Sequence, residues 1–309
     1  MKTDVICVGL TCADILIQGV DLTTPFEGES KPADTVTVSV GGDAANQAIV
    51  LSKMGVKAKL MTGIGNDAVS AMIRQVFEQA GVDMSETKDV TGTSAVNVVV
   101  IAKDGQRNFI NSGLPESTFF SPDFSKLKDA SVISLGSIGV PPFMVAKTVV
   151  ETAKAAKASG AIVCADVIYN PESATLEELK EALSCIDYIF PNEEEARLLT
   201  GKETLDEIAD VFLEYGIQTV LIKIGKDGVF VKNREGSRVY PAIGTKVVDT
   251  TGAGDNFASG FITGLVEGKD LSGCVELAAA TAGVAIQSVG ATTGVTSRSQ
   301  VEEHLQKYR

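Results

Sequence analysis

Short apolar runs alternate with longer amphipathic segments along most of the chain. The apolar runs predict strands at residues 5–9, 59–62, 132–135, 162–166, 188–190 and 219–224, and a strand pair at 228–231 and 238–241. The amphipathic segments predict helices at residues 44–54, 68–80, 143–159, 176–183, 193–199 and 205–215, and a helical block from 255 to 308. Strands that alternate with helices in this way predict an α/β fold, with a mainly parallel sheet covered by helices on both faces.

Two segments, residues 11–40 and 90–116, interrupt this alternation. In the second, an Asp-Gly turn separates apolar runs at 95–102 and 107–110, which is typical of a β-hairpin. We expect both segments to pair as one small sheet that projects from a core made of residues 1–10, 41–89 and 117–309. Valines recur here at alternate positions, namely Val36, Val38, Val96, Val98 and Val100. So small a sheet cannot cover an apolar face by itself, so we expect a homodimer through it, or else packing against its own core.

Composition narrows the range of functions. Of the 309 residues, 44% are hydrophobic and 22% charged, which excludes a disordered or collagen-like chain. The net charge of -13 makes nucleic acid and membrane surfaces poor partners, although local backbone amides can still bind a small anion. Five scattered cysteines without a signal peptide predict a cytoplasmic protein. The single histidine, His304, excludes a Ser-His-Asp triad and a His-rich zinc site, so a carboxylate must carry any proton transfer.

The sharpest motif is the glycine-rich turn Gly252-Ala253-Gly254-Asp255, which opens a predicted helix. Small residues let the free amides of the first helical turn approach a phosphate. An aspartate repels a phosphate, but it suits this position if it accepts the proton of a hydroxyl that attacks phosphorus. The alternative is a plain turn in which Asp255 is the helix N-cap.

A second glycine turn, Gly41-Gly42, precedes Asp43 and Asn46 at the start of another predicted helix. Tight backbone and an amide side chain suit a hydroxyl-rich ligand, although Asp43 could equally be a helix cap. Asp14 follows the first strand, at the edge where open α/β sheets place their sites, or it is a turn residue.

Two further segments suit a nucleotide and its metal ion. Asn192 and Glu195 could hold a water-coordinated Mg²⁺, or they could form a capping box. The segment Lys223–Gly228 lies at a strand end and suits either phosphates or a plain hairpin turn.

The segment Gly63–Ala68 matches a loose dinucleotide-binding pattern, with Asp83 at the expected distance. However, the ribose-binding acid should end a second strand, and only two residues separate Asp83 from the predicted helix. A dehydrogenase is therefore a minor alternative.

Together the motifs resemble the ribokinase-like, or PfkB, family of carbohydrate kinases over essentially the whole chain. The family's amino-terminal signature corresponds to GGDAANQAIVLSKMGVKAKLMTGIG, and its carboxyl-terminal signature to DTTGAGDNFASGFI. The segment NEEE also matches the family's N-x-x-E motif. The resemblance implies a three-layer α/β/α sandwich, in which the small sheet is a lid over the sugar site and a frequent dimer interface.

The same resemblance implies transfer of a phosphoryl group from ATP to a sugar hydroxyl. Asp255 would be the general base, and the amides of Gly252, Ala253 and Gly254 would stabilise the developing charge. Sugar would be bound by Asp14, Gly41, Gly42, Asp43 and Asn46, and ATP by Asn192, Lys223, Gly225, Gly228, Asn256 and Ala280. Glu195 would hold Mg²⁺ through water. A monovalent cation, expected to be K⁺, would be framed by Asp249, Thr251, Ala285 and Gly290.

The sugar itself stays open between fructose-, ribose- and 2-keto-3-deoxygluconate-like compounds. Asp43 disfavours a phosphorylated sugar by charge repulsion, whereas Arg107 could bind the carboxylate of a sugar acid or be an ordinary exposed residue. A nucleoside kinase of the same superfamily and a catalytically silent sugar-binding regulator are the alternatives. The intact Asp255 and its unbroken glycine turn argue against the silent regulator.

Overall fold

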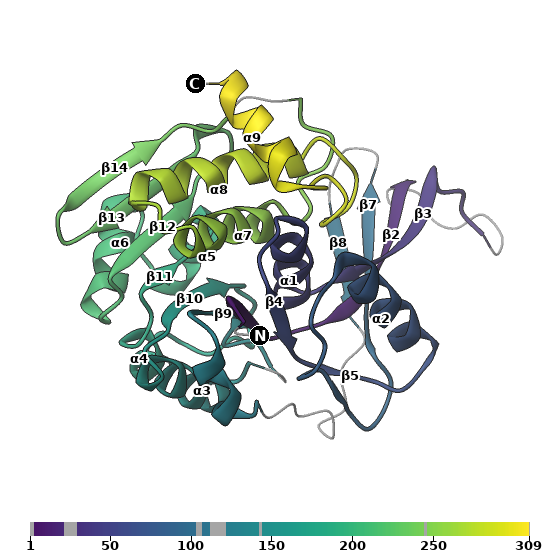
Figure 1. Ribbon diagram of the computed structural model, residues 1–309. Coiled ribbons are helices and arrows are strands. Elements are labelled where there is room, and N and C mark those ends of the chain that lie inside the picture. Colours follow the sequence, from purple (N-terminus) through teal and green to yellow (C-terminus); the bar gives the residue numbers. More distant parts are fainter. Residues whose placement is uncertain are drawn as a thin grey trace.

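The central element of the fold is an eight-stranded sheet in the order β14-β13-β12-β11-β10-β9-β1-β4 (Figure 1). The computed structural model describes residues 3–21, 30–102, 107–111, 122–141, 144–243 and 246–308. The strands are β1 (Val5–Val8), β4 (Ala58–Met61), β9 (Val132–Ile138), β10 (Ile162–Val167), β11 (Tyr188–Ile189), β12 (Thr219–Lys223), β13 (Val229–Asn233) and β14 (Gly236–Tyr240). All neighbouring strands pair in parallel except β13, which is antiparallel to both β12 and β14. The predicted α/β class with a mainly parallel sheet is confirmed.

Helices cover both faces of this sheet, because its inner strands are apolar on both sides. In β1, Val5 and Cys7 enter one hydrophobic core, while Ile6 and Val8 enter the other. The first core is covered by α1 (Asp43–Lys53), α2 (Ala68–Ala80), α7 (Ala253–Val266) and α8 (Leu271–Ala285), and the second by α3 (Ala146–Ala158), α4 (Lys180–Leu183), α5 (Glu193–Thr200) and α6 (Leu205–Glu214). A third apolar cluster joins α8 to α9 (Arg298–Lys307). Within the described residues, no helix has the length and apolar character that a bilayer crossing requires.

Two predicted helices differ from the structure. The block from 255 to 308 is three helices, because α7 ends before Gly268, which has a φ of 71°, and Asp270 and Ser297 cap the next two. The helix predicted at 176–183 is only α4, because a turn precedes it in which the carboxylate of Glu178 accepts the N–H of Thr175.

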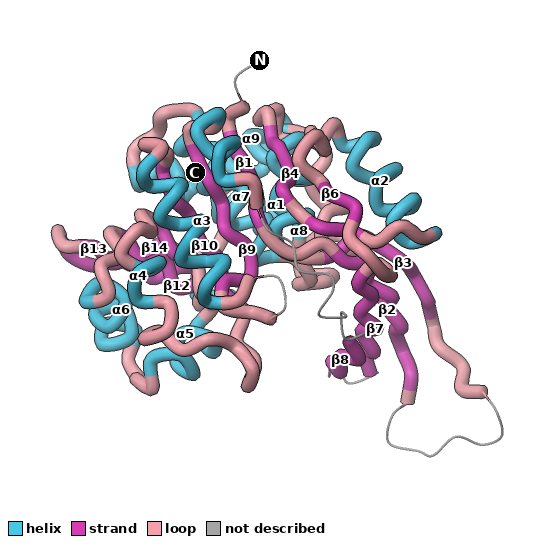
Figure 2. Tube along the Cα trace, turned by 90° about the horizontal axis from the view of Figure 1, so that it is seen from below, coloured by secondary structure: helices cyan, strands magenta, loops and turns pink. Residues whose placement is uncertain are grey.

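The two interrupting segments form one small sheet in the order β3-β2-β7-β8. Its strands are β2 (Cys12–Val20), β3 (Thr35–Gly41), β7 (Ala95–Ala102) and β8 (Arg107–Asn111). Both hairpins are antiparallel, whereas β2 and β7 pair in parallel. Figure 2 shows these strands extending away from the body. The Asp-Gly turn itself lies outside the described residues.

Short elements complete the chain: β5 (Gly63–Ile64) pairs with β6 (Lys88–Asp89), and there are 3₁₀ turns at η2 (Phe124–Asp129) and η3 (Gly225–Asp227). The β5–β6 pair was not predicted. Asp67, in the dinucleotide-like segment, caps α2 and accepts hydrogen bonds from Ser70 and Ser94. That turn therefore has a structural explanation.

Candidate active site

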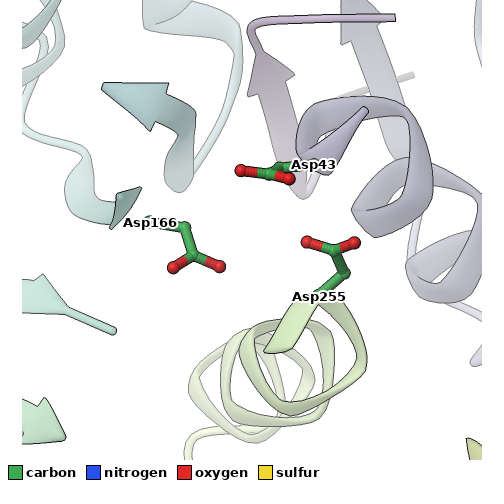
Figure 3. Close-up of side chains that lie close together, drawn as sticks. All are labelled: Asp43, Asp166 and Asp255. Carbon is green, nitrogen blue, oxygen red and sulfur yellow. The ribbon is translucent and has the colours of Figure 1, made fainter. Parts of the chain in front are cut away.

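Three carboxylates converge between the two layers at the carboxyl end of the parallel strands. Asp43 is the first residue of α1, Asp166 lies at the end of β10, and Asp255 is the third residue of α7. One oxygen from each lies within 4.8 Å of the others. Figure 3 shows the three side chains pointing toward a common space. Open α/β sheets place ligand sites at this edge.

Glycines fix where the two helices begin. Gly42 is the N-cap of α1 with a φ of 93°, and a Cβ there would lie 2.4 Å from the carbonyl oxygen of Leu10. Gly252 is the N-cap of α7 with a φ of 70°, and a Cβ there would lie 2.6 Å from Ala291. Neither Asp43 nor Asp255 is therefore a helix cap, and both capping alternatives are wrong. Their carboxylates are left for other partners.

Asp255 is buried and held by a single amide. Nδ2 of Asn46 donates to its Oδ2 at 2.7 Å. Burial raises the pKa of Asp255 well above its ordinary value, and the neighbouring charges of Asp43 and Asp166 raise it further. Among the described residues, nothing donates to the buried Oδ1 of Asn46. The site thus offers a strong proton acceptor beside a hydrogen-bond acceptor that a ligand hydroxyl can satisfy.

The backbone of α7 supplies amides next to that carboxylate. The N–H of Ala253 donates to the carbonyl of Thr250 at 3.2 Å, so it is used within the turn. Gly254 and Asp255 follow in the first turn, where N–H groups have no partner inside the helix. Of the amides expected to bind an anion, that of Gly254 is therefore better placed than that of Ala253.

Asp43 is held by a strained residue. Oγ of Ser137 donates to its Oδ2 at 2.6 Å, and Ser137 is the one non-glycine among the described residues with a positive φ, of 51°. Backbone strain of this kind persists where the surroundings enforce it, often at functional sites. Burial and the charge of Asp166 raise the pKa of Asp43 to about 6.

Lys223 and Glu195 lie close enough to Asp166 for their charges to interact with it. Nζ of Lys223 is 3.2 Å from Oδ1 of Asp166. Glu195 and Asn192 form the capping box of α5, with two reciprocal bonds of 2.8 Å. The capping alternative is thus confirmed for both residues, but burial still raises the pKa of Glu195 to about 7, and Asp166 contributes to that rise. Capping and proximity to the site coexist.

The small sheet contributes Asp14 and Asn97, which are paired across β2 and β7. Nδ2 of Asn97 donates to Oδ1 of Asp14 at 3.2 Å. A Cβ at Gly41 would lie 2.1 Å from the Asp14 carboxylate, so a larger residue there would displace this carboxylate. Burial raises the pKa of Asp14. The side chain of Arg107, the predicted ligand of a sugar acid, lies outside the described residues.

Gly225 and Gly228 form the tight turn of η3 between β12 and β13, and their contact with ATP stays a prediction. Two other residues expected to face ATP are placed differently. Asn256 is fully buried, and its Nδ2 binds the carbonyls of Gly252 and Ala291, both at 2.7 Å. Ala280 is buried in the cluster between α8 and α9. The Asn256 side chain therefore ties the turn to Ala291, and the Ala280 side chain packs in the apolar cluster.

The residues expected to frame a monovalent cation do come together. Asp249 accepts the N–H of Thr251 at 2.9 Å with one oxygen and the N–H of Gly290 at 2.9 Å with the other. The carbonyl of Ala285 packs against Gly294 nearby, at 2.5 Å from where a Cβ would be. This arrangement ties the α7 turn to the loop after α8.

Three residues of the site were not predicted from the sequence, namely Asp166, Asn97 and Ser137. Asp166 ends a buried apolar strand on the same edge as the other aspartates, and this signal was available. Asn97 sits in an alternating run, where it reads as an outward polar residue. Ser137 ends a buried strand and carries no motif.

Comparison with known proteins decides the family. Residues 2–298 match the pfkB family carbohydrate kinases. The chain belongs to this family. It is 30% identical to the ribokinase of Haemophilus influenzae over 99% of both chains, and 26% identical to the 2-dehydro-3-deoxygluconokinase of Bacillus subtilis over 89% of both. The structure of Arabidopsis thaliana ribokinase complexed with ribose and ATP superposes with a TM-score of 0.85, at 28% identity and 99% coverage of both chains.

Membership in the pfkB family confirms the resemblance seen in the two signatures and the ribokinase-like three-layer fold with its small sheet. It also confirms a carbohydrate kinase rather than a dehydrogenase. The glycine turn at Gly252 and the aspartate cluster belong to that kinase fold.

Proposed function

We propose that this chain transfers the γ-phosphoryl group of ATP to a hydroxyl of a small uncharged sugar, with Asp255 as the general base. The observation that carries the proposal is the placement of Asp255. It is buried, its pKa is raised, and it lies in the first turn of α7 beside the amide of Gly254. A base with a raised pKa accepts a proton more readily near neutral pH.

In this proposal, the sugar lies between the small sheet and α7. Asp14 and Asn97 would bind its hydroxyls from the sheet, and the free Oδ1 of Asn46 would accept another. The hydroxyl next to Asp255 would lose its proton to that carboxylate as it attacks phosphorus. The amide of Gly254 would then stabilise the charge on the transferred group.

The charge of the site favours a neutral sugar over a sugar acid or a sugar phosphate. Asp14, Asp43, Asp166 and Asp255 all lie at the site, and the described cation that acts on the last three is Lys223. An added carboxylate or phosphate would meet like charges at close range. Ribose-like and fructose-like compounds therefore stand ahead of 2-keto-3-deoxygluconate. The relatives include ribokinases, a 2-dehydro-3-deoxygluconokinase and a 6-phosphofructokinase, so this order rests on the charge of the site.

Mg²⁺ fits the chemistry of the donor set. Carboxylates of Glu195, Asp166 and Asp43 outnumber the ammonium of Lys223, and hard divalent cations prefer such oxygens. Glu195 and Asn192 would hold the ion through water, and the ion would neutralise the phosphates of ATP. K⁺ is proposed to bind beside Asp249, whose carboxylate accepts the N–H groups of Thr251 and Gly290.

We also propose a homodimer through the outer face of the small sheet. Val38, Ile15, Val98 and Ile110 are in register across all four strands. Val38 and Ile110 are 59% and 63% exposed. A second copy would cover this apolar row, and a two-fold dimer is the commonest closed assembly.

ADP release, measured with ATP, Mg²⁺ and a panel of compounds, tests the proposed activity. The panel contains ribose, fructose, 2-keto-3-deoxygluconate, sugar phosphates and nucleosides. We expect turnover with a neutral sugar and at least about tenfold lower kcat/KM with the acidic ones, as one unfavourable charge contact would cause. If a nucleoside is turned over with a higher kcat/KM than any sugar, the chain is a nucleoside kinase and the proposed sugar substrate is wrong. Binding of sugars without any turnover would support the silent regulator.

A further inference from the structure

Lys223 lies between the segment at Asn192, which is proposed to hold Mg²⁺, and the turn of α7 that carries Asp255. It is the last residue of β12, and its N–H donates to the carbonyl of Pro191 at 2.9 Å, directly before Asn192. Its side chain reaches across to α7, where a Cβ on Gly254 would lie 2.7 Å from Nζ. The ammonium therefore lies against the helical turn that carries the base.

The charges around Lys223 keep it protonated. Burial alone would lower its pKa, but the carboxylates of Asp166 and Glu195 raise it above the ordinary value. Its side chain is 17% exposed, and that of its partner Asp166 is 4% exposed. A cation that is this well shielded from water interacts strongly with any anion that enters beside it.

We propose that Lys223 is a catalytic residue whose ammonium leaves Asp166 and binds the phosphoryl group during its transfer. This inference rests on the proposed function. The sugar oxygen forms a bond to the γ-phosphorus while its proton moves to the Asp255 carboxylate. The bond between the γ-phosphorus and the bridging oxygen breaks, and its electron pair stays on ADP. Lys223 keeps its protons throughout and neutralises charge on the phosphoryl oxygens.

A purely structural role would require only that Lys223 neutralise Asp166. The position of Nζ argues for more, because Nζ also faces the turn that carries the base, where a Cβ added at Gly254 would lie 2.7 Å from it. The two roles differ in what happens when both charges are removed together.

The test compares Lys223→Met with the wild type, and the double variant Lys223→Met/Asp166→Asn with the single variant Asp166→Asn. The second comparison keeps the loss of Asp166 constant, because this carboxylate belongs to the set proposed to hold Mg²⁺. Lys232→Met is the matched control, because Lys232 lies on the adjacent strand β13 and pairs with Asp206 and Asp210 away from the site. Each protein is assayed for kcat, for KM of ATP and of the sugar, and for melting temperature.

We expect kcat of Lys223→Met to fall at least about 10²-fold, the usual effect of losing one preorganised charge contact, with KM for the sugar changed less than about threefold. The double variant should regain the melting temperature, but its kcat should lie at least about tenfold below that of Asp166→Asn, and Lys232→Met should keep kcat. If Lys223→Met does not fold, the comparison of the double variant with Asp166→Asn decides.

A double variant whose kcat lies within about threefold of that of Asp166→Asn would overturn the catalytic role. So would a rise in KM for ATP at unchanged kcat, which would mean ground-state binding of the nucleotide only. A wild-type protein that turns over no sugar would instead refute the proposed function.

Discussion

Replacement of Asp255 by asparagine should change activity and stability in opposite directions. The side chains have nearly the same shape, so the variant can still accept the hydrogen bond from Nδ2 of Asn46 through its amide oxygen. It cannot accept a proton from the sugar. Loss of a positioned base lowers turnover by about 10² to 10⁴, while sugar and ATP should bind nearly as before.

The gain in stability follows from the carboxylate cluster. The carboxylate oxygens lie within 4.8 Å of one another, and two like charges at about that distance repel each other by about 3.5 kcal/mol at an effective dielectric constant of about 20. Attraction by Lys223 and partial protonation reduce this, so we expect a net gain of about 1–2 kcal/mol. For a chain of this size, that corresponds to a melting temperature higher by about 2–6 °C.

The stability gain should depend on pH with a defined sign. Because the folded protein raises the pKa of Asp255, ionisation of this group destabilises the fold at high pH. The penalty shrinks as the pH falls below the folded pKa, where the native carboxyl binds a proton that the unfolded one does not, and it disappears near the ordinary pKa of an aspartate. The advantage of Asp255→Asn should therefore increase from pH 5 to pH 8.5.

The assays are ADP release at saturating substrates and thermal melting at several pH values. Asp210→Asn is a matched control, since that carboxylate is 52% exposed and its ion pair with Lys232 lies outside the site; its melting temperature should not rise. Turnover of Asp255→Asn within about fivefold of the wild type would refute the base assignment. A melting temperature that falls at pH 8.5 would refute the electrostatic reasoning.

Three further predictions address the turn, the cations and the assembly. Gly254→Val places a side chain against Nζ of Lys223, so turnover should fall at least about 10²-fold, and an active variant would show that the turn is merely structural. Chelation of Mg²⁺ should abolish turnover, and replacement of K⁺ by a large organic cation should reduce it through the site at Asp249; equal rates in both salts would remove the K⁺ proposal. Light scattering should give twice the 32.3 kDa chain mass, and the double change Val98→Lys/Val100→Lys should give a folded monomer; a dimer that survives this change does not use the outer face of the small sheet.

Local features of the chain were predictable from the sequence, because each depends on residues that are neighbours along it. The strand Val5–Val8 is buried on both faces, so it reads as an unbroken apolar run. The alternating valines of the small sheet mark its pleat, and the register shows them on one face. The glycine turn before Asp255 signalled an anion site, because a helix start and its free amides are encoded within a few residues.

Contacts between distant segments were decided by the tertiary structure alone. The sequence placed Asp255 and Asp43 at two separate motifs, and Asp166 in none. In the structure α1 packs against α7, and the carboxylates of all three residues lie within 4.8 Å of one another. The raised pKa of Asp255 follows from that packing, since burial and neighbouring charge depend on three-dimensional distance. The first residues of α1 and α7 could not be predicted from the hydrophobic pattern either. Their N-caps are glycines, Gly42 and Gly252, which lie close against Leu10 and Ala291. The chemistry of the site therefore arises where residues that are remote in the chain share one low-dielectric space.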